Sequence, residues 1–268
     1  MRAAVPISSL QNSKVKLAVR LRGRRDRERE GLMLVEGNDE LSLALASGAR
    51  PQTLFVTPGL PDSARDGLLA RAREAGAEIV EVTPPVFKKM SYRDNPDGWL
   101  AIVPVTRRSL ADLRLPENAL VLAAEAIEKP GNLGAMLRTA DAAGAHAVIV
   151  CDPATDVTNP NVVRSSRGTL FSVPTITADG DSTLAWLREH GLIIVAATPQ
   201  ADQPYTAADL RGPVALAVGT EDAGLTQAWL NAADRRVRIP MHGRVNSLNV
   251  ATAAALLLYE AVRQRAAR

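Results

Sequence analysis

Short apolar runs alternate with amphipathic stretches along most of the chain, which is the pattern of strands and helices in turn. In the first hundred residues, apolar runs predict four strands, at residues 32–35, 53–56, 79–82 and 100–105. Helical spacing, in one case ending at a glycine, is found at residues 13–29, 39–46 and 63–75. The first part of the chain therefore predicts a small α/β unit.

From residue 119 the strands become apolar throughout. They are predicted at residues 119–124, 147–151, 192–197, 214–218 and 237–239. Helical patterns separate or follow them, at residues 133–143, 183–190, 227–233 and 248–265. Strands without polar alternation are buried on both faces, as in a parallel sheet covered by helices on each side. We therefore predict an α/β fold with a parallel sheet for this part.

A polar stretch at residues 106–118 (TRRSLADLRLPEN) separates the two patterns. A chain of 268 residues is long enough for about two domains. The sequence thus predicts a domain at residues 1–105, a linker at 106–118 and a second domain at 119–268.

Composition narrows the class of protein. Hydrophobic residues make up 46% of the chain and charged residues 23%, which is ordinary for a globular protein. No run of about 18 apolar residues predicts a membrane span, and the first residues lack the apolar core of a signal peptide. The single cysteine, Cys151, excludes an intrachain disulfide and is expected to end a buried strand. We expect a cytoplasmic protein without membrane association.

Basic residues cluster near the N-terminus although the net charge is only +3. Eight of them lie within one predicted helix: Lys14, Lys16, Arg20, Arg22, Arg24, Arg25, Arg27 and Arg29. Only Asp26 and Glu28 are acidic in that span. The cluster is either a solvated helix with local ion pairs or a surface that contacts phosphates. Charge alone does not decide between the two.

Several familiar sites are absent from the sequence. It contains neither the G-x-x-x-x-G-K-[ST] phosphate loop nor the G-x-S-x-G nucleophile elbow. The three histidines, His146, His190 and His242, are scattered and no cysteine pair accompanies them. Zinc binding therefore has no ligand set in the sequence, and we predict no metal.

A loop rich in glycine follows the predicted strand at residues 119–124 and opens a helix. Pro130 and Gly131 form a turn, and Asn132 is suited to cap the helix that follows. Arg138 stands among small and apolar residues in that helix. Because an unpaired buried charge is costly, Arg138 needs a partner, and a phosphate would be a natural one.

Two further loops carry polar residues at the ends of strands. Glu221 lies where the strand at 214–218 ends, which is the edge where ligands approach open α/β sheets. Asp222 is explained by the positive end of the helix that starts near Thr226. Ser247 either caps the last helix or has a functional role. Asn249 is a poor helix former, so we expect it to have a polar partner.

Together these loops resemble the three motifs of the SpoU (TrmH-type) family of RNA 2′-O-ribose methyltransferases, in the SPOUT class. The motifs occur in the family's order at residues 132–138, 219–225 and 247–249. Residues 12–16 (NSKVK) and 34–37 (LVEG) resemble the small RNA-binding domain, similar to a ribosomal-protein fold, that often precedes the catalytic one. The chain departs from the pattern at Lys129, where an acid before the proline is common, at residues 222–223, and at Ala251.

The resemblance implies a C-terminal domain with a deep trefoil knot, S-adenosylmethionine (AdoMet) as the methyl donor, and a homodimer. The cofactor would be held, mainly through backbone groups, by Thr198, Gly219, Ile239, Met241 and Leu248. The catalytic set it implies is Arg138, Asn132, Glu221, Ser247 and Asn249. The RNA-binding residues would be Lys14, Lys16, Arg22, Arg24 and Arg25.

The resemblance places Arg138 at the reacting hydroxyl, with two roles open. Arg138 is either the general base or a group that orients the hydroxyl and stabilises the developing alkoxide, and the second role suits a side chain that stays protonated. Asn132 and Asn249 would fix the loops or the ribose, Glu221 would organise the site, and Ser247 would position Arg138 or an RNA phosphate.

Other functions are weighed against this one. Ribosomal RNA, the 23S species, is the expected substrate because of the basic N-terminal domain, with transfer RNA as the next candidate. The alternative is a non-catalytic RNA-binding relative with the same fold. A nicotinamide-dependent enzyme is disfavoured because the glycine fingerprint and the ribose-binding acid of that class are missing.

Overall fold

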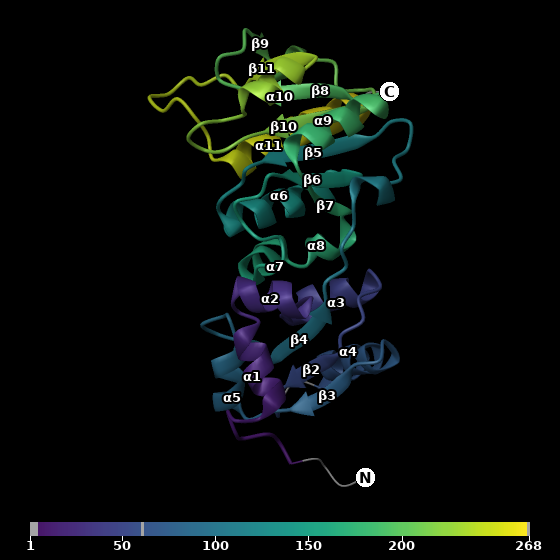
Figure 1. Cartoon of the computed structure of the whole chain (residues 1–268), viewed down its shortest axis with the longest axis vertical. Helices are drawn as coiled ribbons and strands as arrows, with labels where there is room; N and C mark the ends of the chain where they lie inside the picture. The colour runs from purple at the N-terminus through teal and green to yellow at the C-terminus, as the bar shows by residue number, and fades with distance from the viewer. Residues whose placement is uncertain (1–4, 60–61, 267–268) are drawn as a thin grey trace. The chain divides into compact units, whose positions relative to one another are not determined.

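The structure is a computed structural model that describes residues 5–59 and 62–266. The chain forms two compact units (Figure 1). The first contains the chain up to Thr106 together with Asp156–Ser172, and the second contains Arg107–Thr155 and the chain from Val173 onwards.

The first unit is built on a four-stranded sheet in the order β1-β4-β2-β3. Its strands are β1 (Leu32–Glu36), β2 (Thr53–Val56), β3 (Glu78–Glu81) and β4 (Trp99–Pro104). Strand β4 is antiparallel to β1 and β2, whereas β2 and β3 are parallel. The helices that precede or connect them are α1 (Ser13–Arg20), α2 (Arg24–Glu30), α3 (Asn38–Ala46), α4 (Asp62–Glu74) and α5 (Pro84–Met90). All four predicted strands are confirmed to within a few residues.

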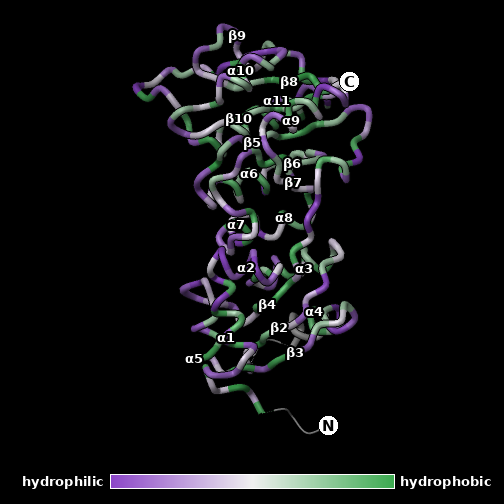
Figure 2. The backbone as a smooth tube through the Cα atoms, viewed as in Figure 1, coloured by the Kyte–Doolittle hydropathy of each residue, from purple (hydrophilic) through white to green (hydrophobic). Residues whose placement is uncertain are grey.

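This sheet has a hydrophobic core on each face because successive strand residues point to opposite sides. On one face Phe55 packs with Val15 of α1 and Phe87 of α5. On the other face Leu54 packs with Leu41 of α3 and with residues of α4. Figure 2 shows the hydrophobic colour concentrated in strands such as β4, which is buried at its first five positions.

The helix predicted at residues 13–29 is interrupted. Helix α1 ends at Arg20, and α2 begins after Gly23, which has an extended backbone. Arg27 donates hydrogen bonds to the carbonyls of Leu21 (3.0 Å) and Arg22 (2.8 Å), so a side chain satisfies backbone groups that the helix would otherwise use. The prediction of one continuous helix is therefore wrong.

Two short helices, α7 (Pro160–Ser166) and α8 (Thr169–Ser172), belong to the first unit. This differs from the sequence analysis, which assigned them to a domain at residues 119–268. Val163 of α7 is buried in the same cluster as Met33 and Val35 of β1. The division at Thr106, in contrast, falls at the start of the predicted linker, in which the structure has only the short helix η1 (Leu110–Asp112).

The second unit contains a seven-stranded sheet in the order β7-β6-β5-β10-β8-β11-β9, parallel throughout. Its strands are β5 (Leu120–Glu125), β6 (Ala147–Cys151), β7 (Thr175–Ala178), β8 (Ile193–Ala197), β9 (Gln203–Pro204), β10 (Val214–Val218) and β11 (Arg235–Arg238). Strands β5, β6 and β10 are buried at every position, which confirms the predicted parallel sheet. The polar strand β7 and the two-residue β9 were not predicted.

Helices cover both faces of this sheet. They are α6 (Pro130–Ala142), α9 (Gly180–Glu189), α10 (Gln227–Ala232) and α11 (Val250–Ala266), with a short η2 (Tyr205–Ala207). Trp229 of α10 and Leu187 of α9 share one core cluster with the strands, while α11 packs against α6 and β10. The knot implied by the family resemblance stays a prediction. No described helix is long and apolar enough to cross a membrane.

Candidate active site

The three loops predicted to carry the chemistry meet at the carboxylate of Glu221. Asn132 at the start of α6 donates from Nδ2 to Glu221 Oε1, and Asn249 before α11 donates to the same oxygen at 3.1 Å. Asn249 Nδ2 also lies 3.1 Å from Asn132 Oδ1. Lys129 donates from Nζ to the other carboxylate oxygen, Oε2. Asn132, Glu221 and Asn249, one residue from each motif, are thus joined to one another by hydrogen bonds.

The start of α6 explains the position of Asn132. The residue that precedes the helix is Lys129, which makes no side-chain cap, and Pro130 occupies the first helical position, where proline is tolerated. Asn132 is the third residue of the helix and its amide reaches Glu221, so the interpretation of Asn132 as a helix cap is wrong. A carboxylate at this end of a helix is favoured by the helix dipole.

Asn249 caps the last helix. Its Oδ1 accepts hydrogen bonds from the backbone N–H groups of Ala251 (3.0 Å) and Thr252 (3.4 Å). Its Nδ2 also donates to Asn132 and to Glu221. The prediction that Asn249 has a polar partner is therefore confirmed. Ser247, the alternative cap, is exposed and has no hydrogen-bond partner among the described residues.

The loop after β10 is held by its own backbone. Thr220 and Gly224 exchange two backbone hydrogen bonds of 3.0 and 3.1 Å, and Gly224 has a φ of 70°. A Cβ at Gly219 would collide with the carbonyl of Gly224. Gly219 is thus required by the turn itself, which places Glu221 at the edge of the sheet.

The acid that meets helix α10 is Glu125. Its carboxylate accepts from the backbone N–H of Thr226 (2.8 Å) and from the Thr226 hydroxyl (2.7 Å), and the side chain is 4% exposed. This role was predicted for Asp222, which is exposed. Glu125 was missed because it ends an apolar strand and has no polar neighbour to draw attention to it.

Arg138 is exposed. Helix α6 buries Leu133, Leu137 and Ala140, and Arg138 lies outside that buried set. No hydrogen bond or ion pair joins it to another described residue. The expectation that Arg138 needs a partner because it is buried is therefore wrong, and its five donors are available to a ligand.

The residues predicted to hold AdoMet lie around the ends of neighbouring strands. Thr198 follows β8, and Ile239 and Met241 follow β11; these strands and β10 are adjacent in the sheet. The backbone N–H of Thr198 donates to the Val237 carbonyl at 2.9 Å, which ties two of these ends together. Since the strands are parallel, their carboxyl ends share one edge.

The loop at residues 239–248 suits a nucleoside. No hydrogen bond joins any of its residues to another part of the described chain, so its backbone donors and acceptors are available. Ile239, Met241 and Leu248 are each half-buried and add apolar surface. Apolar side chains with a few backbone polar groups are typical of cofactor sites. The residues present therefore fit AdoMet, and no cluster of metal ligands is found in the described residues.

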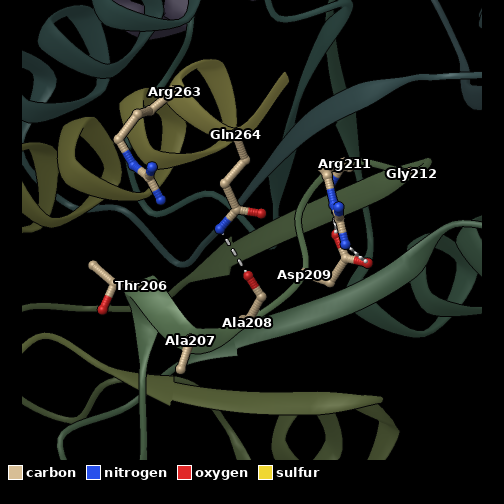
Figure 3. Close-up of a pocket in the computed structure, with 8 residues that line it drawn as sticks. All are labelled: Thr206, Ala207, Ala208, Asp209, Arg211, Gly212, Arg263 and Gln264. Atoms are coloured by element: carbon tan, nitrogen blue, oxygen red, sulfur yellow. Dashed lines mark hydrogen bonds and ion pairs between the residues drawn. The ribbon is translucent and has the colours of Figure 1, made fainter. Parts of the chain in front are cut away.

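A cavity of about 590 Å³ lies elsewhere in the second unit (Figure 3). Gly212, just before β10, and Gln264, in the last turns of α11, line it, so it is at the edge where the strands begin. Its two arginines are each paired with an acid, Arg211 with Asp209 and Arg263 with Glu260. The cavity is therefore separate from the Glu221 network and offers no unpaired charge.

The basic N-terminal residues fall into two groups. Lys14 pairs with Glu78, and Arg24 pairs with Glu28 at 2.7 Å, so these two charges are locally balanced. The others predicted to bind RNA are exposed and have no acidic partner among the described residues: Lys16, Arg22 and Arg25. Local ion pairs thus account for Lys14 and Arg24, and a contact with phosphates stays a prediction for the other three.

The LVEG motif at residues 34–37 orders the surface around Arg22. Glu36 is 7% exposed and accepts from Ser91 Oγ (2.5 Å) and from the backbone N–H of Tyr92 (2.7 Å). The Tyr92 hydroxyl donates to the Arg22 carbonyl at 2.8 Å, and the Arg22 guanidinium lies 4.9 Å from the centre of the Tyr92 ring. Tyr92 was missed in the sequence because no motif marks it.

Cys151 is buried, as predicted. Its sulfur lies 3.6 Å from Thr183 Oγ1, and burial raises the pKa of the thiol to about 12. Cys151 therefore stays protonated at neutral pH and is not a nucleophile.

A parallel α/β sheet with a polar network and an open backbone loop at its carboxyl edge defines an enzyme that binds a nucleoside cofactor. Comparison with known proteins gives the family: residues 119–259 match the SpoU rRNA Methylase family, and residues 12–101 match the MRM3-like substrate binding domain. The chain belongs to the SpoU rRNA methylase family, as its three motifs predicted.

Similar proteins cover nearly the whole chain. The 23S rRNA (uridine(2479)-2′-O)-methyltransferase of Streptomyces viridochromogenes is 35% identical over 91% of this chain and 87% of its own. The 23S rRNA (guanosine(2553)-2′-O)-methyltransferase RlmP of Bacillus subtilis is 31% identical over 94% and 97%. The crystal structure of an AdoMet-bound rRNA methyltransferase from Sinorhizobium meliloti is 31% identical, covers 97% of both chains and has a TM-score of 0.89.

Proposed function

We propose that this protein transfers a methyl group from AdoMet to a ribose 2′-hydroxyl of 23S ribosomal RNA. The observation that carries the proposal is the cross-linked set of Asn132, Glu221 and Asn249, one residue from each family motif. Two similar proteins are named as 23S rRNA 2′-O-methyltransferases, one acting on a uridine and the other on a guanosine. Because their nucleotides differ, the nucleotide modified by this protein has to be mapped.

The cofactor would be held by Thr198, Gly219, Ile239, Met241 and Leu248, and when bound it supplies an electrophilic methyl group. The task of the protein is to align the attacking oxygen and to exclude other geometries. Glu221 accepts the amides of Asn132 and Asn249 and so fixes the two helix starts relative to each other. A rigid arrangement of this kind keeps its orientation during the reaction.

Arg138 would act on the ribose itself. Its exposed guanidinium can donate to the 2′-oxygen as negative charge develops there and to a neighbouring phosphate. Because an arginine side chain remains protonated, Arg138 orients and stabilises, and the proton leaves to water or to a phosphate oxygen. Ser247, exposed before α11, would help to position the RNA.

We further propose that the protein works as a cytoplasmic homodimer. Among the described residues of the second unit, the large hydrophobic side chains that are exposed are Val245 (64%) and Tyr259 (50%). Tyr259 lies on α11, the helix that packs against α6, and Val245 lies in the loop before it. A second copy that packs against both α11 and the loop before it would remove both side chains from water. Sedimentation of the wild-type chain and of Tyr259→Arg tests this: the variant should shift toward the monomer.

The RNA itself would be gripped by the first unit. Lys16, Arg22 and Arg25 present unbalanced positive charge, and such charge attracts the RNA backbone without reading its sequence. The Glu36–Tyr92 contacts hold Arg22 in place for this role.

The test is methyl transfer with labelled AdoMet to 23S rRNA lacking the modification, followed by nuclease digestion and mapping of the labelled nucleotide. We expect the label on a ribose 2′-oxygen. Label on a base would contradict the reaction, and label on transfer RNA alone would move the substrate. RNA binding without AdoMet binding, measured by calorimetry, would support the non-catalytic relative instead.

A further inference from the structure

Lys129 is the residue of the active-site loops that the motif pattern does not account for. The common residue before the proline is an acid, and here it is a lysine whose side chain is 66% exposed. Its ammonium contacts Glu221 Oε2, and its backbone stands directly before α6. A cation has thus been placed against the central carboxylate of the site.

We propose that Lys129 is a positioning residue for methyl transfer: its ammonium anchors the Glu221 carboxylate in the orientation that holds Asn132 and Asn249. This assignment rests on the proposed ribose methylation. It adds one side chain to the site. Lys129 acts on methyl transfer by holding Glu221 and does not contact the RNA or the cofactor.

The geometry gives the reason. Both asparagine amides bind the same carboxylate oxygen, Oε1, so Oε2 takes no part in holding them. Lys129 binds Oε2 and supplies the second point of attachment. With Lys129 present the carboxylate is held at both oxygens, whereas without it only the contacts at Oε1 resist a change of orientation.

Charge works in the same direction. The hydrogen bond from Lys129 is the main reason that the pKa of Glu221 lies below its ordinary value, with Asn132 adding to the effect. In turn Glu221 raises the pKa of Lys129. Oε1 faces two amide N–H groups and Oε2 faces the ammonium of Lys129, so a proton on either oxygen would point at a donor. An ionised Glu221 is therefore the form that holds the network.

A direct contact between Lys129 and an RNA phosphate is the competing role. The ammonium is already paired with Glu221, so neutralising it should remove little of the charge that the protein offers to RNA. The two roles differ in what they move: a phosphate contact changes the salt dependence of RNA binding, and a positioning contact changes the pH dependence of catalysis.

The experiment is a double-mutant cycle with Lys129→Gln and Glu221→Gln in the full-length protein, measured by single-turnover methyl transfer from pH 3.5 to pH 8, a range that includes the acid limb of Glu221. Lys129→Gln should slow transfer by about tenfold at neutral pH, within the range of couplings between contacting residues. Its acid limb should lie at higher pH, because Glu221 has lost the group that lowers its pKa. Lys129→Arg should restore most of the rate and the wild-type limb. In the Glu221→Gln background, Lys129→Gln should have no further effect.

Lys88→Gln is the matched control, because it removes an exposed ammonium from α5 and should not move the acid limb. Additive effects of Lys129→Gln and Glu221→Gln would overturn the proposal, as would a reduced salt slope of RNA binding in Lys129→Gln. The same cycle measured by urea unfolding at pH 7 tests the pair without methyl transfer. A coupled pair in a wild-type protein that does not methylate ribose would refute the proposed function and leave the contact established.

Discussion

The Arg27 guanidinium forms a 2.6 Å ion pair with the carboxylate of Asp156, 129 positions further along the chain. Arg27 is 2% exposed, and its remaining donors reach Thr158 and the carbonyls of Leu21 and Arg22. One side chain therefore binds the backbone between α1 and α2 and also forms an ion pair with the segment that begins at Asp156. In the sequence Arg27 looks like any other member of the basic cluster.

Removing this arginine should be costly. Arg27→Ala leaves Asp156 without its partner, and breaking a buried ion pair costs about 3–5 kcal/mol of unfolding free energy. Because Asp156 keeps some contact with water, we expect a loss near the lower end, measured by urea unfolding at pH 7. Arg29→Ala removes an exposed arginine of the same helix and should cost much less, because exposed ion pairs contribute little to stability. Equal losses would show that the pair is not special.

The loss should also depend on pH. Burial pushes the pKa of Asp156 up, but hydrogen bonds from Arg27 and Thr158 outweigh burial and hold the pKa below its ordinary value of 3.8. In the wild type this contribution is complete above that value and fades as the pH falls below it. In Arg27→Ala only burial opposes ionisation strongly, so Asp156 takes up a proton at higher pH. The difference in unfolding free energy should therefore be smaller at pH 4 than at pH 7.

The second unit alone should bind AdoMet, but residues 156–172 should be unfolded in it. A fragment from residue 107 onwards keeps every cofactor loop but loses the core in which Val163 is buried. We expect calorimetry to show AdoMet binding and limited proteolysis to cut within residues 156–172. Replacing those residues by a short glycine-serine linker should remove the cleavage. A fragment that resists protease at 156–172 would show that the segment folds without the first unit.

Arg138→Ala should separate catalysis from folding. Because the side chain is exposed and unpaired among the described residues, unfolding free energy and AdoMet affinity should stay close to wild type. Single-turnover methyl transfer should fall by about 10² or more, as when a charge-stabilising donor is removed. Arg138→Lys should recover only part, since an ammonium lacks the planar fork. A near wild-type rate in the alanine variant would remove Arg138 from the mechanism.

RNA affinity should depend on the basic residues that lack an acidic partner. Neutralising Lys16, Arg22 and Arg25 together should weaken binding and lower the salt slope by about 0.7 for each RNA phosphate that the protein no longer neutralises. The matched control neutralises Lys14 and Arg24, which are paired with Glu78 and Glu28 and should change the slope less. A filter-binding titration against salt measures both. An unchanged slope in the first variant would assign the whole cluster to a solvated helix face.

The sequence predicted the strands well because most are apolar throughout and lie in the cores. It failed where a side chain decides the backbone: α1 ends at Arg20, and Arg27 binds the carbonyls of the next two residues, Leu21 and Arg22. Helix α5 was missed because Pro84 and Pro85 look like breakers, although proline is tolerated in the first turn.

The residues of the site were also predicted in part. Asn132, Glu221 and Asn249 came from motifs, and the structure brings them together. Glu125 could not be found in this way, because an acid at the end of an apolar strand is common, and Lys129 was noted only as a departure from the motif, without its contact with Glu221. Their importance depends on which residues the fold places opposite them, and that is a property of three dimensions.

Residues 156–172 belong to the first unit, although the residues before and after them in the sequence belong to the second. The polypeptide therefore passes between the units three times. A substrate-binding domain that is one continuous stretch of sequence can be exchanged by recombination at a single site. Here that domain is assembled from two stretches of gene separated by part of the catalytic domain. Recombination at residue 106 alone would transfer the first unit without residues 156–172, which lie within the region that matches the methylase family.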